Sequence, residues 1–131
     1  MNAPVPKILL VDDDELVRML YGRQLEQVGY QVVCAGTGKE ALDITFLDHP
    51  QAIILDIDMP EMDGFSALRE LQDQAATRAI PVIIITSVAD YRLCREAAKA
   101  HGATAFLTKP FGPKQLLTEV QKALQGSAEV A

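Results

Sequence analysis

The sequence predicts one α/β domain built around a parallel, doubly wound sheet. Short apolar runs alternate along the 131 residues with stretches whose apolar residues recur at helical spacing. Several of the short runs are continuous stretches of valine, isoleucine and leucine, which is typical of strands buried on both faces. A regular alternation of strand and helix favours right-handed crossovers, which place all the strands in parallel.

Five short runs are the expected strands of this sheet. The first, third and fourth are the clearest, because they consist almost entirely of large aliphatic residues. In chain order the expected strands are Lys7–Val11, Gln31–Ala35, Ala52–Asp56, Val82–Thr86 and Ala105–Thr108.

Five helices are expected between and after the strands, each marked by apolar residues at helical spacing. Gly29 ends the first helix, and Pro113 suits the first turn of the fifth. The fourth, over residues 91–101, has the weakest apolar stripe and is therefore the easiest to displace. The markers are Val17, Leu20, Tyr21, Leu25 and Val28 in the first helix, Leu42, Thr45 and Phe46 in the second, Phe65, Leu68 and Leu71 in the third, Tyr91, Cys94, Ala97 and Ala98 in the fourth, and Leu116, Leu117, Val120 and Leu124 in the fifth.

Composition limits the function classes. The net charge of −6 argues against non-specific binding to nucleic acid or to anionic membranes. No apolar run approaches the ~18 residues of a membrane span, and the first residues lack the features of a signal peptide, so the cytoplasm is the expected location. Cys34 and Cys94 share no metal or redox spacing and are expected to be small buried hydrophobes. Residues 1–131 are expected to form a single domain with a core over about 6–125 and frayed ends.

Aspartates follow two of the strands, at the edge where open α/β proteins bind their ligands. Asp12, Asp13 and Asp14 come directly after the first strand, and Asp56 ends the third, with Asp58 just beyond it. Like charges about 5 Å apart repel by roughly 3 kcal/mol at an effective dielectric constant near 20. Such a cluster therefore needs a cation, and Mg²⁺ is a hard ion that carboxylates hold while leaving positions open for phosphate oxygens.

A hydroxyl and an ammonium group are expected at the same edge. Thr86 and Ser87 close the fourth strand, and Lys109 follows the fifth. An aspartate beside the cation can attack phosphorus and form an aspartyl phosphate, while the lysine shares the charge on the phosphoryl oxygens. Each residue also has a plainer role, since Asp13 or Asp14 can cap the first helix, Ser87 can be a cap and Lys109 can be solvated. The joint placement at strand ends favours a site.

The motifs resemble those of receiver domains of two-component response regulators, which have the chemotaxis-regulator-like fold. The resemblance covers about residues 6–125. It implies a five-stranded sheet in the order 2-1-3-4-5 with five helices. The matching motifs are Leu10-Val11-Asp12-Asp13, then Asp56 followed by Met59-Pro60 and Met62-Asp63-Gly64, then Ile85-Thr86, and finally Lys109-Pro110-Phe111.

This resemblance implies a phosphoacceptor signalling domain and not an enzyme. Asp56 would take a phosphoryl group from a histidine kinase or a histidine phosphotransfer protein. Mg²⁺ would be bound by Asp56, directly by Asp13, mainly through water by Asp12, and by the main-chain carbonyl of Asp58. Thr86 and Lys109 would each bind a phosphoryl oxygen; the peptide bond after the lysine is expected to be cis.

The resemblance also implies how the signal leaves the domain. Thr86 would move toward the phosphoryl group and Phe106 would follow it, so these two residues form the expected switch. The output surface would be the fourth helix, fifth strand and fifth helix, read by a downstream protein or output domain. Phe106 stands where the family often has tyrosine. Val88 stands where many members have a polar residue, which bears on the lifetime of the phosphorylated form.

Two other functions fit parts of the sequence. Asp56-Ile57-Asp58 also resembles the nucleophile motif of Mg²⁺-dependent haloacid-dehalogenase-like phosphatases, although those enzymes have a further acidic segment after their lysine, and here nothing acidic follows Lys109 until Glu119. A degenerate receiver could act as a scaffold without phosphorylation, but the complete set of site residues argues against it. Whether the domain stands alone or belongs to a longer protein stays open.

Overall fold

The computed structural model describes residues 5–58, 64–87, 96, 99–100, 102–109 and 111–130. Its core is one parallel sheet in the order β2-β1-β3-β4-β5. The order agrees with the one that the resemblance implied, and the strand boundaries agree with those expected from the sequence. The aliphatic runs of the first, third and fourth strands do mark strands that are buried on both faces. The strands are β1 (Lys7–Val11), β2 (Gln31–Ala35), β3 (Ala52–Asp56), β4 (Val82–Thr86) and β5 (Ala105–Thr108).

Four helices are defined within the described residues, where five were expected: α1 (Glu15–Gln27), α2 (Gly38–Asp48), α3 (Gly64–Asp73) and α5 (Pro113–Val130). The expected fourth helix lies mostly outside the described residues, which include only Glu96, Lys99 and Ala100 of it, all helical. α5 includes residues 126–130, where frayed chain was expected. Within the described part of the chain, no helix has the length and apolarity that a membrane crossing requires.

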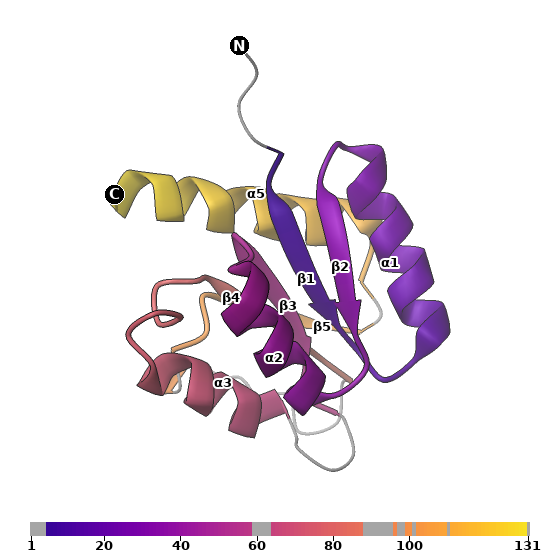
Figure 1. The fold of residues 1–131 in the computed structure, drawn as a ribbon. Helices are drawn as coiled ribbons and strands as arrows, with labels where there is room; N and C mark the ends of the chain where they lie inside the picture. The colour runs from indigo at the N-terminus through magenta and orange to yellow at the C-terminus, as the bar shows by residue number, and fades with distance from the viewer. Residues whose placement is uncertain are drawn as a thin grey trace.

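The helices cover the two faces of the sheet in pairs. Alternate residues of β1 face opposite sides, so that Leu9 and Val11 pack in the cluster with α2 and α3, whereas Ile8 and Leu10 pack in the cluster with α1 and α5. Figure 1 shows α2 and α3 on one side of the strands and α1 and α5 on the other. This arrangement leaves the carboxyl ends of the strands free to carry a site.

The apolar stripe of α1 differs from the one expected. Leu20 and Val28 are 55% and 54% exposed, whereas Gly22 and Leu25 are buried. Successive helical residues are about 100° apart, so Leu20 lies on the side of the helix opposite Gly22. Gly22 lies against β2, since a Cβ atom there would be 3.8 Å from Cγ1 of Val32, and the helix buries Leu25 while Leu20 and Val28 stay exposed.

Gly22→Ala is expected to stabilise the protein by about 0.5–1 kcal/mol, because glycine is the weaker helix former in a helix interior. A Cβ atom at position 22 would lie 3.8 Å from Cγ1 of Val32, which is ordinary van der Waals contact. Urea denaturation of the two proteins checks the expectation. A loss of stability would show that α1 and β2 are packed too closely here for a methyl group.

Candidate functional site

Three aspartates meet at the carboxyl edge of the sheet. Val11 of β1 pairs with Leu55 of β3, so the residues that follow, Asp12 and Asp56, emerge side by side. One carboxylate oxygen from each of Asp12, Asp13 and Asp56 lies within 4.8 Å of the other two. The side chains of Asp12 and Asp56 are only 1% and 2% exposed, and Asp13 forms the exposed side of the cluster.

Lys109 faces this cluster from the end of β5. Its Nζ lies 3.1 Å from Oδ2 of Asp12 and 3.5 Å from Oδ2 of Asp56. Its backbone N–H donates to the carbonyl of Thr86 over 2.7 Å, which fixes the start of the segment after β5 beside the end of β4. Burial disfavours the ammonium form, but the hydrogen bonds and charges of Asp12 and Asp56 outweigh it and raise the pKa of Lys109. The lysine is therefore a fixed cation in the pocket.

Asp56 holds its proton unusually tightly. Burial is the main cause, and the charges of Asp12 and Asp58 add to it, so that the pKa of Asp56 rises from 3.8 to about 6. Two contacts work in the opposite direction: the charge of Lys109, and the hydrogen bond that the Asp58 N–H donates to Oδ1 of Asp56 over 2.9 Å. The same hydrogen bond fixes the rotation of the carboxylate and leaves Oδ2 facing Lys109.

The structure separates the roles of the first three acids. Asp14 caps α1, since its Oδ1 accepts the N–H of Leu16 over 2.9 Å. Oδ1 of Asp12 accepts the N–H of Asp14 over 3.0 Å, and its Oδ2 faces Lys109. Because Asp14 supplies the cap, the carboxylate of Asp13 is available to the pocket.

The carboxylate of Asp58 does not face the three other acids. It accepts the hydroxyl proton of Thr86, with oxygen–oxygen distances of 3.0 and 3.1 Å, and the backbone N–H of Ser87 over 2.7 Å. From the sequence, Asp58 was expected to offer its main-chain carbonyl to the metal and its side chain to the path of the hydrolytic water; a contact with Thr86 was not predicted. The side-chain contact depends on how the chain turns after β3, for which the sequence carries no signal.

Gly64 lets α3 begin directly beside the phosphoacceptor candidate. A Cβ atom at this position would lie 2.6 Å from the carbonyl oxygen of Asp56 and 2.6 Å from Cα of Ile57. The dipeptide Asp63-Gly64 is typical of a turn that precedes a helix, and α3 does begin at Gly64. The close backbone approach to Asp56 is an additional reason for glycine here. The motif residues 59–60, 62–63 and 110 lie outside the described residues, as does Val88.

Aromatic residues pack on both faces of the sheet. Phe106 is partly buried against the cluster of α2 and α3. Tyr21 of α1 stacks on Phe111, with ring centroids 4.9 Å apart and planes inclined by 18°. This stack links α1 to the segment after Lys109. Sequence reasoning placed Tyr21 only in an apolar stripe, since nothing in the sequence pairs it with Phe111.

The donor set fits a hard divalent cation. Three carboxylate oxygens converge, and the single ammonium group of Lys109 compensates only one of the three charges. Oxygen ligands with surplus negative charge are what Mg²⁺ prefers in proteins. The local charge therefore supports the cation that the sequence predicted.

Asp13→Asn is expected to stabilise the metal-free protein by roughly 1 kcal/mol, because it relieves repulsion among like charges. It should also weaken Mg²⁺ binding at least tenfold. Thermal melting without metal and a calorimetric Mg²⁺ titration measure the two effects. Asp14→Asn is the matched control, since asparagine is an equally good cap. A lower melting temperature with unchanged Mg²⁺ affinity would mean that Asp13 serves the helix and not the metal.

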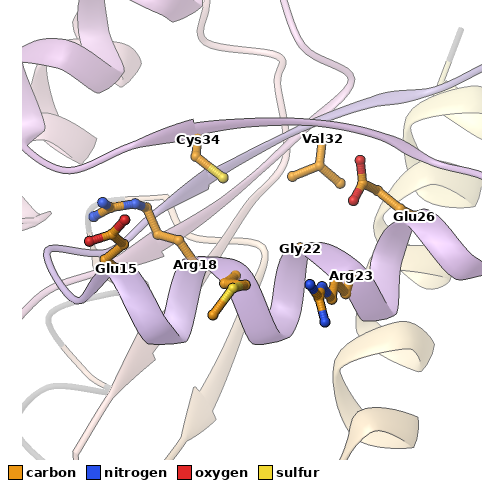
Figure 2. Close-up of a pocket in the computed structure, with 8 residues that line it drawn as sticks. Glu15, Arg18, Gly22, Arg23, Glu26, Val32 and Cys34 are labelled. Atoms are coloured by element: carbon orange, nitrogen blue, oxygen red, sulfur yellow. The ribbon is translucent and has the colours of Figure 1, made fainter.

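A second concavity lies away from these acids, between α1 and β2. It has a volume of about 350 Å³, and Figure 2 shows Val32 and Cys34 pointing into it from β2. Cys34 was expected to be buried but is exposed: it lies on β2, an edge strand of the sheet, and lines this concavity. Partial burial raises the pKa of Cys34, so the thiol stays protonated at neutral pH.

Comparison with known proteins gives a consistent result. A family model described as the response regulator receiver domain matches residues 8–121. A probable transcriptional regulator, ycf27 of Cyanophora paradoxa, is 37% identical over 125 residues, which cover 95% of this chain and 51% of that protein. The transcriptional regulatory protein PdtaR of Mycobacterium tuberculosis is 34% identical over 131 residues, which cover 98% of this chain and 62% of that protein.

Solved structures agree with the sequence matches. The chemotaxis protein CheY4 of Vibrio cholerae superposes with a TM-score of 0.86 at 32% identity, covering 92% of this chain and 100% of that one. The chain spans about half the length of the first curated relatives that it matches.

Proposed function

Because the chain belongs to the family of response regulator receiver domains, we propose that it accepts a phosphoryl group on Asp56 and thereby switches a partner-binding surface. Receiver domains are phosphoacceptor signalling domains of two-component systems and not enzymes in the ordinary sense. The family match favours this function over the phosphatase alternative. The observation that carries the assignment to Asp56 is its buried carboxylate, which faces the ammonium group of Lys109 at 3.5 Å.

Phosphoryl transfer needs an ionised and oriented carboxylate. An oxygen of Asp56 attacks the phosphorus of the donor, a new oxygen–phosphorus bond forms, and the bond from phosphorus to the histidine nitrogen of the kinase or phosphotransfer protein breaks. The N–H of Asp58 orients the carboxylate through its 2.9 Å hydrogen bond to Oδ1. Lys109 already lies beside Oδ2 and can exchange its contact with Asp56 for one with a phosphoryl oxygen.

The acids at the carboxyl edge would hold Mg²⁺. Asp13 and Asp56 would supply carboxylate oxygens directly, Asp12 would act mainly through water, and Asp58 would offer its main-chain carbonyl. When bound, the cation neutralises the carboxylates and the phosphoryl oxygens, as in other phosphoryl transfers.

The phosphorylated state would be read at the face formed by the fourth helix, β5 and α5. Most of that expected helix lies outside the described residues. Thr86 moves toward the phosphoryl group, and Phe106 takes up the space that Thr86 leaves. These movements shift the equilibrium of this face from its unphosphorylated conformation toward its phosphorylated conformation. A depression of about 220 Å³ on β5 and α5 gives a partner a place to bind; it is lined by Leu107, Lys114, Gln115, Thr118 and Glu119.

The reader of this face is a downstream protein or an output domain. Two of the relatives are transcriptional regulators by name, and they are longer than this chain. We propose that residues 1–131 are one receiver unit, acting either alone or as the receiver part of such a regulator. Direct contact with nucleic acid is not proposed for this unit, whose net charge is −6.

Intact mass spectrometry after incubation with acetyl phosphate and Mg²⁺ tests the proposed function. One phosphoryl mass should be added, and chelation of the metal with EDTA should prevent the addition. A protein that stays unmodified under these conditions would have to act without phosphorylation. Multiple turnover of p-nitrophenyl phosphate would instead indicate a phosphatase.

The output face should respond to beryllofluoride, which mimics the phosphoryl group. Amide chemical shifts of residues lining the β5–α5 depression should change, and those of Leu47, at the far end of α2, should not. Two-dimensional NMR with and without beryllofluoride measures this. If the shifts around Leu107 and Lys114 do not move, the output lies at another surface.

A further inference from the structure

The hydroxyl group of Thr86 is held by a partner outside the acidic pocket. Thr86 is fully buried, and its Oγ1 lies 3.0 and 3.1 Å from the two carboxylate oxygens of Asp58. The backbone N–H of Ser87 donates to Oδ2 of the same carboxylate over 2.7 Å. The Asp58 carboxylate therefore accepts hydrogen bonds from two successive residues at the end of β4.

A hydroxyl group has one proton and can donate it to one strong acceptor at a time. If Thr86 is to donate to a phosphoryl oxygen on Asp56, its hydroxyl must first leave the Asp58 carboxylate. We propose that the Asp58 side chain is a positioning residue that holds Thr86 in its unphosphorylated arrangement and so opposes the switch. This inference rests on the proposed function of Asp56 and adds a second, competing acceptor for the switch residue.

We call the contact between the Asp58 carboxylate and the Thr86 hydroxyl the latch. The hydrogen-bond energies allow it to break and re-form. Hydrogen bonds to an ionised acceptor are stronger than neutral ones, and a phosphoryl oxygen is an ionised acceptor too. Phosphorylation therefore exchanges one anionic partner of Thr86 for another. Asp58 is an exposed residue, so its carboxylate can turn to water after Thr86 leaves. Neither state leaves a buried charge without a partner.

The latch must be distinguished from simple charge repulsion, because Asp58 is also a negative charge close to Asp56. Repulsion acts on any bound anion whether or not Thr86 carries a hydroxyl group. The latch acts only through that hydroxyl. A double-mutant cycle of Asp58→Ala and Thr86→Ala therefore separates them, and both substitutions leave the main-chain carbonyl of Asp58 in place.

The measured quantity is the dissociation constant of beryllofluoride, determined by NMR titration in the presence of Mg²⁺. In the wild-type background, Asp58→Ala should tighten binding about tenfold. In the Thr86→Ala background the same substitution should tighten it at most about twofold. Asp58→Asn, which keeps an acceptor oxygen but loses the charge, should fall between wild type and Asp58→Ala.

A second readout uses the variant without ligand. The methyl resonance of Thr86 in metal-free Asp58→Ala should move from its wild-type position toward the position seen in beryllofluoride-saturated wild type. A shift in this direction would show that Thr86 has left Asp58. A local loss of stability would instead broaden resonances or shift them without a common direction.

Equal tightening by Asp58→Ala in both backgrounds, or an unmoved Thr86 methyl resonance, would overturn the latch and leave the proposed function intact. Wild-type protein that does not bind beryllofluoride at all would instead overturn the phosphoacceptor role, and the latch with it.

Discussion

Asp56→Asn is expected to abolish phosphorylation by acetyl phosphate and, without metal, to make the protein more stable than wild type at neutral pH. The folded protein binds the Asp56 proton with a pKa of about 6, against an ordinary value of 3.8. Ionising this buried carboxylate beside Asp12 therefore costs roughly 2–3 kcal/mol of folding free energy, which asparagine avoids. Asparagine can still accept the N–H of Asp58.

The raised pKa of Asp56 determines how the stability difference between Asp56→Asn and wild type changes with pH. Between pH 3.8 and about 6 the unfolded chain releases the Asp56 proton while the folded protein keeps it. Because the folded state then binds more protons at Asp56, the contribution of this group to the stability of the wild type falls as the pH rises through this window, and the loss is complete above it. The stability gap between Asp56→Asn and wild type should therefore be small at pH 4 and almost fully developed at pH 7.

Urea denaturation of the metal-free proteins at several pH values measures this gap. Asp43→Asn removes an exposed acid of α2 and is the matched control, for which little change is expected. If Asp56→Asn were less stable than wild type at pH 7, or if the stability gap did not change with pH, ionisation of the Asp56 carboxylate would not be what destabilises the metal-free protein. If the variant still gained a phosphoryl mass, Asp56 would not be the acceptor.

Gly64→Ala is expected to lower the free energy of unfolding by about 2–3 kcal/mol, because the new methyl group has no free space. Its Cβ would lie 2.6 Å from the backbone of Asp56 and of Ile57, and backbone atoms cannot swing aside as the end of a side chain can. Either the start of α3 or the end of β3 must move. Movement of β3 would displace Asp56 from Lys109 and slow phosphorylation.

Gly22→Ala is the matched control for this substitution, because it introduces the same methyl group where a Cβ meets only Val32 at 3.8 Å. Urea denaturation and the rate of phosphorylation by acetyl phosphate should be measured for both variants. Equal stability of the two variants would mean that the chain around Gly64 relaxes easily, and the close approach would not constrain the site.

The strands could be predicted from the sequence because both faces of the sheet are covered. A strand such as β3, buried at every position, leaves a continuous aliphatic run that no helix pattern obscures. The stripe of α1 was predicted less well, because apolar periodicity takes no account of a glycine, and Gly22 is buried where α1 contacts β2. Leu20 and Val28 fit the helical spacing but lie outside that contact.

The charged groups of the site could be predicted because topology alone brings them together. Asp12, Asp56 and Lys109 each follow a parallel strand, so the sheet places them at one edge whatever the loops do. The contact between Asp58 and Thr86 depends instead on loop conformation and side-chain rotation, which the sequence pattern does not encode. The same holds for the stacking of Tyr21 on Phe111.

The most direct test of the phosphoacceptor role is to locate the phosphoryl group within the chain. Borohydride reduces an aspartyl phosphate to homoserine, so protein treated with acetyl phosphate and Mg²⁺, then reduced and digested, carries homoserine at the modified position. Peptide mass mapping should find homoserine at position 56 and aspartate still at positions 12, 13 and 58. Homoserine at any of those three positions, or at none in the chain, would contradict the account.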